Sequence, residues 1–547
     1  MESIPWLESE IEHGFWRAVS HVAGRIGTCL RLRALSGMII AHRGGKLNGG
    51  RAAVQSRSDH TLRLERDDAG WHATGDLAVR LGSPHSIYAE WRWDGHRLSL
   101  RNDRYGMLPV FAVVEPNRVI LSTSIQGALE AGAPTDLDPA AMAVILRLGY
   151  PVGDDTPFLS IRTIPPGVTI DWDAVPALRG GPFIVPPNGL ARDPAMDAYV
   201  DLFRQAMGRC SPSGRFVVPL SGGRDSRHIL LALLEAGHRP DHLVTTHYRS
   251  PRSREDVRIA ALVAEELGLG HEVLSQTDLP VVAELRKNLL TNYCTPESHA
   301  WYLPVADHLA TGFDVSYDGI AGDVLSMARY LRPADLEEFR KERFENLARS
   351  MLERDGTSLR GMLRTAAVDL FSLESAIERL RRELPRHAGA SNPVRSFRFW
   401  NYTRRAIGPV PFSMVRGPQV HAPYLDHDVF DMLAGLAPEV LMERAGHFHT
   451  DVIKHGYPRY AHLPFESADY RGAGYPRSDR QYARNALMYL IRTGPATQIS
   501  RRYVMPRLAR CVLDPSYGQS VTWLAPRAIY LTQLQAMIER VTSSRTT

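Results

Sequence analysis

Apolar and polar residues alternate over short stretches in the first part of the chain. Residues 87–93 follow this pattern, as do residues 98–100 and 110–114. A period of two is typical of β-strands that bury one face. Turn residues such as Asp94-Gly95 and Pro116-Asn117 separate the stretches. The pattern therefore predicts a meander of antiparallel strands.

The pattern changes after a stretch rich in proline and glycine, residues 181–190, which we interpret as a linker. Beyond it, segments with helical periodicity alternate with short apolar runs. We expect helices over residues 195–210 and 255–267, and strands over residues 216–220, 243–247 and 271–274. Strands that alternate with helices predict a parallel, doubly wound sheet.

We therefore expect an α/β protein with two domains, since 547 residues exceed what one hydrophobic core accommodates. The β-rich domain spans residues 1–180, and the α/β domain spans residues 191–540 and ends in a helical extension. Charged stretches within that extension are interpreted as solvent-facing helix surfaces. Residues 541–547 are expected to form a disordered tail.

Composition narrows the class of protein. Hydrophobic residues make up 44% of the chain and charged residues 23%, which is typical of soluble globular proteins. We find no apolar run long enough for a membrane span and no basic start typical of a secretory signal. The net charge of +5 is mild, and the four cysteines form no C-x-x-C pair. We expect a cytoplasmic protein without a cysteine zinc cluster and without nucleic-acid or membrane partners.

The clearest candidate for chemistry is the string Ser221-Gly222-Gly223-Arg224-Asp225-Ser226, between a predicted strand and an apolar helical run. Adjacent glycines let backbone N–H groups approach a phosphate, and a helix start adds further donors. The kinase-type string G-x-x-x-x-G-K-[ST] is absent. A carboxylate beside phosphates is repelled by them unless it holds Mg²⁺, so Asp225 predicts a magnesium-dependent ATP site.

This string resembles the pyrophosphatase loop of adenylating ATP enzymes. Further blocks, in the same order, resemble the asparagine synthetase B family, which includes β-lactam synthetases and lasso-peptide macrolactam cyclases. These blocks are residues 98–111, residues 121–124, Asp155-Thr156-Pro157-Phe158, Ile164-Pro165-Pro166-Gly167, residues 315–323 and Ala422-Pro423-Tyr424-Leu425-Asp426-His427.

The resemblance implies a fold and a site. The fold is an N-terminal glutaminase-like domain, an Ntn-type α+β sandwich, followed by a sheet of the ATP-pyrophosphatase type. The cofactors are ATP and Mg²⁺, with Asp225 and Asp323 as catalytic metal ligands. The residues expected at the nucleotide are Ser221, Gly222, Gly223, Arg224, Asp225, Ser226, Thr246, His247 and Gly322.

The chain departs from the family pattern at three places. It opens Met1-Glu2-Ser3, without the cysteine nucleophile of the glutamine-using members, so we expect no glutaminase activity. Ile320 stands where the family has a glutamate or tyrosine, and Phe465 where it has a lysine. The candidate replacements for that lysine are Lys454, Arg471 and Arg477, of which we favour the first two as catalytic.

The resemblance implies an ATP-dependent ligase that adenylates a carboxylate, releases pyrophosphate and joins the acyl group to an amine. We favour intramolecular closure of a small molecule or peptide, as in β-lactam or macrolactam formation. For a peptide, the expected partners are a precursor peptide and its leader-processing protease. Amidation with free ammonia, a tRNA-modifying thiolase and a non-catalytic nucleotide-binding homologue stay open as alternatives.

Other candidates are weaker. His447 and His449 form a possible metal pair, although such a pair is more often surface or core histidine. Residues 297–301 could line a substrate pocket. In the interpretation that we favour, they begin a helix and Trp301 lies in the core. Asp469, Tyr470 and Tyr475 lie in a glycine-containing stretch where a substrate lid is plausible.

Overall fold

The computed structural model describes residues 59–83, 87–172, 182–248, 251–296, 299–328, 331–353, 356–466, 476–514, 517 and 523–546. The predictions that concern the start of the chain, including the missing N-terminal cysteine, lie outside these residues. The same holds for Arg471 and for the proposed lid residues Asp469, Tyr470 and Tyr475.

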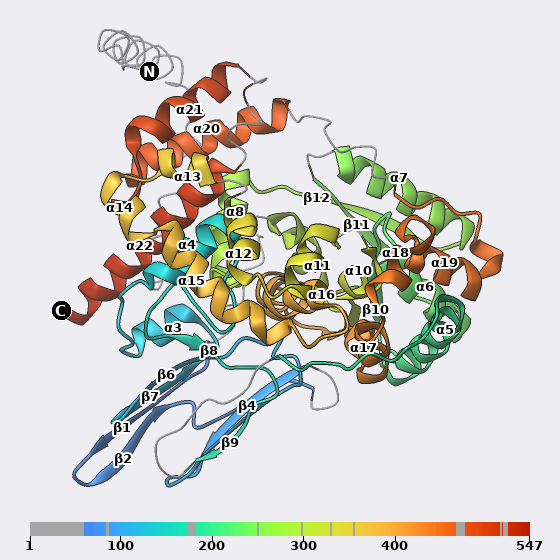
Figure 1. Ribbon diagram of the computed structural model, residues 1–547, viewed down its shortest axis with the longest axis horizontal. Coiled ribbons are helices and arrows are strands. Elements are labelled where there is room, and N and C mark those ends of the chain that lie inside the picture. The colour runs from blue at the N-terminus through green and yellow to red at the C-terminus, as the bar shows by residue number, and fades with distance from the viewer. Residues whose placement is uncertain are drawn as a thin grey trace. The chain divides into compact units, whose positions relative to one another are not determined.

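The first described part is built from two antiparallel sheets, drawn in blue to teal in Figure 1. One sheet has the order β2-β1-β7-β6-β8, with bounds Gly70–Gly75, Thr61–Asp67, Arg118–Ser122, Phe111–Glu115 and Arg162–Thr163. The other has the order β3-β4-β5-β9, with bounds Ala78–Gly82, Tyr88–Trp93, Leu98–Asn102 and Thr169–Trp172. The strands predicted at 87–93, 98–100 and 110–114 are thus confirmed as β4, β5 and β6.

Alternation along the strands explains how these sheets are buried. Leu64 of β1 and Leu81 of β3 enter one hydrophobic cluster, so the two sheets share a core. Val113 of β6 and Ile120 of β7 point to the opposite face and join a second cluster with helices α3 (Ile125–Glu130) and α4 (Pro139–Leu148). Around β6 and β7 the five-stranded sheet is therefore covered on both faces, which suits the largely apolar sequence of these two strands. The predicted glutaminase-like nature of this part stays a prediction.

The second sheet system is parallel and five-stranded, with the order β12-β11-β10-β13-β14. The bounds are His271–Ser275, Leu243–His247, Phe216–Pro219, Val315–Tyr317 and Gln419–His421. All neighbouring strands in it pair in parallel, which confirms the predicted parallel sheet. The chain order reverses between β10 and β13, and ligands of such sheets bind outside the carboxyl ends at this reversal.

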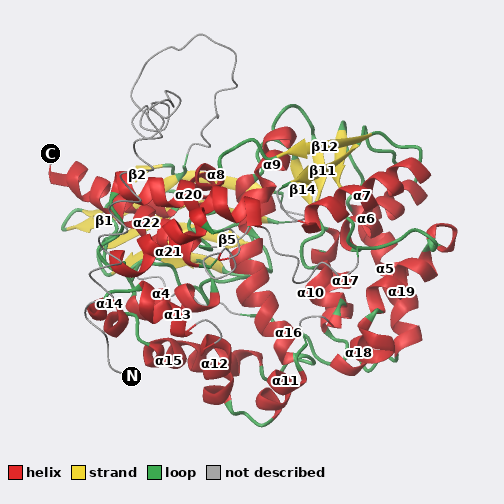
Figure 2. Cartoon of the chain, turned by 90° about the horizontal axis from the view of Figure 1, so that it is seen from above, coloured by secondary structure: helices red, strands yellow, loops and turns green. Residues whose placement is uncertain are grey.

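Helices cover this sheet on both sides. Figure 2 shows β11, β12 and β14 between α9 on one side and α6 and α7 on the other. The helices near the sheet are α5 (Arg192–Arg209), α6 (Asp225–Glu235), α7 (Pro251–Glu266), α8 (Pro280–Leu290), α9 (Leu303–Leu309) and α10 (Gly322–Ser326). The helices predicted at 195–210 and 255–267 are confirmed as α5 and α7.

The C-terminal part is mainly helical, as expected. It contains α11 (Pro333–Arg340), α12 (Phe344–Leu352), α13 (Gly356–Met362), α14 (Thr365–Leu370), α15 (Leu373–Glu383), α16 (Pro393–Phe397), α17 (His427–Ala434), α18 (Pro438–Gly446), α19 (Phe448–Gly456), α20 (Pro476–Thr493), α21 (Arg501–Leu513) and α22 (Leu524–Thr546). Wider helical turns run from Arg398 to Ile407 and from Val410 to Met414. None of the described helices combines the length and the apolar character that crossing a membrane requires.

The predicted disordered tail differs from the structure, because α22 continues through Thr546. Val541 is buried, and the Arg545 guanidinium donates hydrogen bonds to the carbonyl oxygens of Leu129 and Ala133. The polar composition that suggested disorder therefore belongs to the exposed face of an anchored helix.

Candidate active site

The glycine-rich string forms the predicted turn between β10 and α6, at the carboxyl end of the strand where the sheet order reverses. Its backbone donors already have partners within the protein. The Ser221 N–H donates to Ser226 Oγ at 3.1 Å, and the Gly223 N–H donates to Ser221 Oγ at 3.1 Å. The Gly222 N–H donates to Asp256 Oδ1 at 2.9 Å. A phosphate that uses these amides must therefore displace or share internal hydrogen bonds.

Asp256 is a buried carboxylate of α7 that sequence reasoning missed. The position of Asp256 also explains why residue 222 is a glycine. A Cβ at Gly222 would lie 3.2 Å from Asp256 Oδ1 and 3.3 Å from side-chain atoms of Ile259 and Glu466. These distances are tighter than ordinary contacts, so glycine fits this position because of packing as well as chemistry.

Asp225 begins α6 and lies against a second loop, residues 318–322, which follows β13. A Cβ at Gly319 would lie 2.7 Å from the Asp225 Cβ, and one at Gly322 would lie 2.6 Å from Asp225 Oδ1. Two glycines from this loop therefore make room for the carboxylate. The structure thus brings Asp225 and Gly322 together, as the sequence predicted.

Two more carboxylates lie in or directly after this second loop. Asp323 is half-buried at the start of α10. Asp318, at the end of β13, accepts hydrogen bonds from the Ile320 N–H at 2.8 Å and from the Tyr302 hydroxyl at 3.1 Å. The sequence analysis included Asp318 in the block 315–323 but did not select it as a site residue.

The electrostatics of these groups are coupled. Burial raises the pKa of Asp225; contact with His449 opposes the rise, and the nearby Asp323 carboxylate adds to it. Burial also raises the pKa of Asp318, with a smaller contribution from Asp225 in the same direction. Asp225 Oδ1 is buried, and His449 Nδ1 lies 3.2 Å from it. Asp225 thus lies close enough to Asp318 and Asp323 for their charges to interact, and carboxylate oxygens are the ligands that a hard divalent cation prefers.

A buried cluster of polar side chains packs against Asp225. His449 Nδ1 lies 3.2 Å from Asp225 Oδ1 and 2.8 Å from Ser326 Oγ. On the other side of the ring, His449 Nε2 lies 3.2 Å from His228 Nδ1. The Tyr424 hydroxyl donates to the Asp225 carbonyl oxygen at 3.0 Å. The cluster thus links α6, α10 and α19 next to the Asp225 carboxylate.

The structure distinguishes between the two interpretations of His447 and His449, a metal-binding pair or ordinary surface or core histidines. His449 is 1% exposed, whereas His447 lies on the surface, so the two do not form a metal site. The favoured interpretation, surface or core histidine, holds for both. The role of His449 could not be read from its neighbours in sequence, because its partners come from α6 and α10.

A loop after α19 contacts the glycine-rich turn. The Glu466 N–H donates to the Gly222 carbonyl oxygen at 2.8 Å. The guanidinium carbons of Arg224 and Arg227 lie 5.0 and 4.1 Å from the centre of the Phe465 ring. Phe465 thus lies where the resemblance implied a lysine near the turn, and it packs against two arginines.

The two arginines differ in accessibility. Arg227 is buried and donates to the carbonyl oxygens of Leu463 and Pro464, and burial lowers its pKa to about 10. Arg224 is half-buried and donates to Thr450 Oγ1 at 3.0 Å. Lys454 is exposed on α19, five residues after His449, so the two side chains leave the helix in different directions.

The end of β11 contributes Thr246 and His247, as predicted. Thr246 is buried, and its hydroxyl has no hydrogen-bond partner among the residues that the structure describes, while His247 is half-buried. Tyr248 follows, and its ring stacks on Trp301 with centroids 5.7 Å apart. Trp301 is 39% exposed, so the favoured interpretation that placed it in the core is wrong. Its ring covers Tyr248 at the surface instead of entering the interior.

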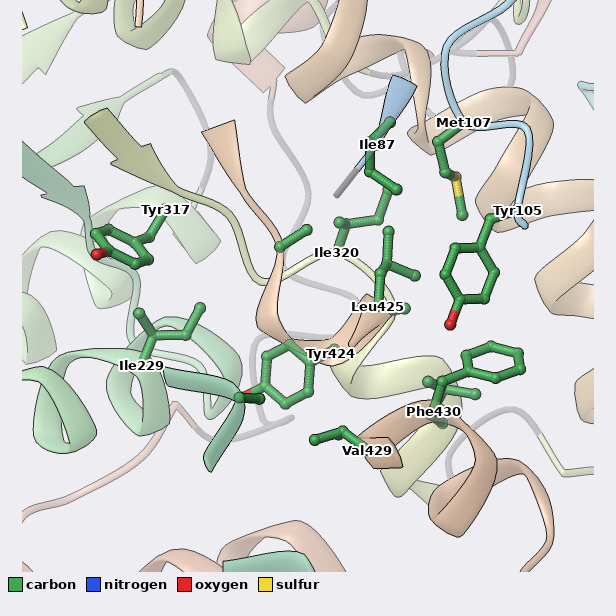
Figure 3. Packing of buried hydrophobic residues seen from close by; sticks show 14 of the residues in the cluster. Ile87, Tyr105, Met107, Ile229, Tyr317, Ile320, Tyr424, Leu425, Val429 and Phe430 are labelled. Carbon is green, nitrogen blue, oxygen red and sulfur yellow. The ribbon is translucent and has the colours of Figure 1, made fainter. Parts of the chain in front are cut away.

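Ile320 has a structural explanation. Its side chain is 4% exposed and belongs to the main hydrophobic cluster. Figure 3 shows it among buried residues that include Ile87 and Leu425. The side chain at this position therefore packs in the core, while the same loop directs Asp318 and Asp323 elsewhere.

The block around Asp103 is structural. Asp103 Oδ1 accepts hydrogen bonds from the N–H groups of Tyr105 and Gly106, which fixes a tight turn. Arg104 in this turn pairs with Asp431 of α17. The block thus ties the antiparallel part to the parallel sheet's helices, and no described contact joins it to the glycine-rich turn.

Comparison with known proteins agrees with this geometry. Residues 198–449 match the family model described as asparagine synthase. No curated protein matches the chain. The matched segment begins in α5, contains both loops and ends at His449. Residues 198–449 therefore resemble an asparagine synthase domain, and this match supports an asparagine synthetase-like family and an ATP-dependent carbon–nitrogen ligase.

Proposed function

We propose that this protein adenylates a substrate carboxylate with ATP, releases pyrophosphate and forms an amide bond with an amine of the same substrate. The observation that carries the proposal is the meeting of Asp225 with the loop of residues 318–322 at the reversal of the sheet order. That arrangement combines a glycine-rich turn, a helix start and carboxylates in the place where such sheets bind ligands.

The carboxylates fit Mg²⁺, which takes oxygen ligands and is usually bound through one or two carboxylates together with phosphate oxygens. Asp225 and Asp323 are the residues that would hold the ion, and the proximity of the Asp323 carboxylate to the buried Asp225 supports this assignment. When bound, Mg²⁺ neutralises charge on the phosphates. Because a cation favours ionised carboxylates, it would reverse the raised pKa of Asp225.

The chain's own residues then orient the nucleotide. The α6 start and the Ser221 and Ser226 hydroxyls face the turn that would hold the phosphates. Arg224 is the cation of this turn, and we assign to it the charge that the family's lysine supplies at the Phe465 position. Thr246, His247 and the Tyr248–Trp301 stack border the adjacent strand end, where we place the adenine.

The amine must lose a proton as it attacks, and Ile320 cannot accept one. Asp318 is the candidate that we favour, since burial raises its pKa and the Tyr302 hydroxyl holds its position. Tethering of amine and carboxylate in one substrate supplies a high effective concentration. This favours intramolecular closure of a peptide or small molecule over amidation by free ammonia.

The reaction type is tested by its nucleotide products. We expect the protein, supplied with ATP, Mg²⁺ and a cognate peptide or amino acid, to form AMP and pyrophosphate in equal amounts. ADP and phosphate as products would contradict adenylation. Turnover with aspartate and ammonia, but not with a peptide, would favour asparagine-type amidation over intramolecular closure. Nucleotide binding without turnover by any of these substrates would favour the non-catalytic homologue.

A further inference from the structure

A second cluster of metal-binding side chains lies at the edge of the parallel sheet opposite the glycine-rich turn. His242 directly precedes β11, Glu272 is the second residue of β12, and His308 is on α9. The two strands are parallel, and Leu243 pairs with His271, so both strands begin at the same edge. The glycine-rich turn follows the carboxyl end of β10. The proposed ligase activity therefore makes no use of this cluster.

The distances in this cluster fit one metal ion. His242 Nε2 lies 3.1 Å from His308 Nε2 and 3.6 Å from Glu272 Oε2, and one ligand atom from each residue lies within 4.8 Å of the others. Ligand atoms about 2.1 Å from a tetrahedral zinc ion stand about 3.4 Å apart. Two imidazoles and a carboxylate are also a donor set that zinc uses with an open fourth position.

The surroundings hold the ligands in place and leave an entry path. The rings of His242 and His308 lie 5.6 and 5.3 Å from the Phe313 ring, so all three rings pack together. The His242 side chain is 25% exposed and the Glu272 side chain 52% exposed. An ion can reach the cluster from solvent, and each ligand lies on a strand, at a strand start or on a helix.

We propose that His242, Glu272 and His308 bind a Zn²⁺ ion that ties the starts of β11 and β12 to α9. The ion stabilises the sheet at the edge away from the nucleotide. It takes no part in amide formation, so this proposal stands independently of the proposed function. The competing explanation is a hydrogen bond between two neutral imidazoles, with no metal.

The test is a zinc titration of the full-length, chelator-treated protein. We expect one high-affinity Zn²⁺ per chain, a tetrahedral cobalt spectrum on substitution with Co²⁺, and an unfolding midpoint raised by about 2–5 °C at excess zinc. The variants Glu272→Gln and His308→Gln keep side-chain size, and each should weaken zinc binding by at least about tenfold. Absence of zinc binding by the wild type would overturn the proposal in favour of the hydrogen bond.

Two controls separate this site from others. His96→Ala removes an exposed histidine of a turn and should leave zinc affinity unchanged. Asp225→Asn removes a carboxylate of the proposed magnesium site and should also leave zinc stoichiometry unchanged. Circular dichroism verifies that each variant is folded. Folded Glu272→Gln and His308→Gln variants that bind zinc like the wild type would overturn the proposal, as would loss of the zinc site in Asp225→Asn.

Discussion

Asp225 is held where its charge is unfavourable in the absence of a cation. Burial raises its pKa above the ordinary value of 3.8, the contact with His449 opposes that rise, and the nearby Asp323 carboxylate adds to it. A carboxyl group whose pKa is raised by folding stabilises the fold while it is protonated, below the unfolded-state pKa. That contribution is lost as the pH rises through the folded-state pKa. Ionisation of Asp225 therefore destabilises the fold relative to its protonated form.

From this cost we predict that Asp225→Asn stabilises the metal-free protein at neutral pH by about 1 kcal/mol, as is common for functional-site substitutions. Thermal unfolding followed by circular dichroism in the presence of a chelator measures the effect. The advantage of the variant should shrink as the pH falls through the folded-state pKa of Asp225, because the wild-type carboxyl then becomes protonated. A variant less stable than the wild type at neutral pH would show that Asp225 has a structural role instead.

Arg224 and Lys454 are two candidates that could replace the lysine that the family has at the Phe465 position. Arg224 belongs to the glycine-rich turn and is half-buried, whereas Lys454 is exposed on α19. We expect Arg224→Ala to lower the rate of pyrophosphate release by about ten- to a hundredfold, as for loss of a major electrostatic stabiliser. Arg224→Lys, which keeps the charge, should recover part of the rate, and Lys454→Ala should change it little. A larger loss of pyrophosphate release in Lys454→Ala than in Arg224→Ala would instead assign the role of the family's lysine to Lys454.

At the scale of elements, the site depends on the close approach of the α6 start to the loop between β13 and α10. Gly322 has no space for a side chain, since a Cβ there would meet Asp225 Oδ1 at 2.6 Å and Asp225 Cγ at 2.7 Å. We therefore predict that Gly322→Ala displaces the Asp225 carboxylate and lowers Mg²⁺-dependent ATP binding by at least about tenfold.

Gly208 offers a matched control for this substitution. It lies near the end of α5, and a Cβ there would meet nothing within 4 Å. Gly208→Ala should leave ATP binding unchanged and stabilise the helix by up to about 1 kcal/mol. Calorimetric titration with ATP compares the two variants. Equal ATP affinities for Gly322→Ala and the wild type would contradict the assigned contact between the loops.

At the scale of the whole molecule, the alternation of strands and helices was predictable because it rests on local periodicity. The strand at 243–247 and the turn at residues 221–226 were placed from sequence alone. The partners of that turn were not, because Asp256, His449 and Glu466 come from elements distant in sequence. The exposure of Trp301 was also missed, since its stacking partner Tyr248 belongs to another segment.

The glycine-rich turn and the predicted metal ligands lie within residues 198–449, the segment that resembles an asparagine synthase domain, so their joint action can be measured before the substrate is known. The most direct measurement is calorimetric titration of the protein with ATP, with and without Mg²⁺, for the wild type, Asp225→Asn and Asp323→Asn. We predict tight binding by the wild type only with Mg²⁺, and at least about a tenfold weaker affinity for each variant. ATP affinity that does not depend on Mg²⁺, or that both substitutions leave unchanged, would contradict the account of this site.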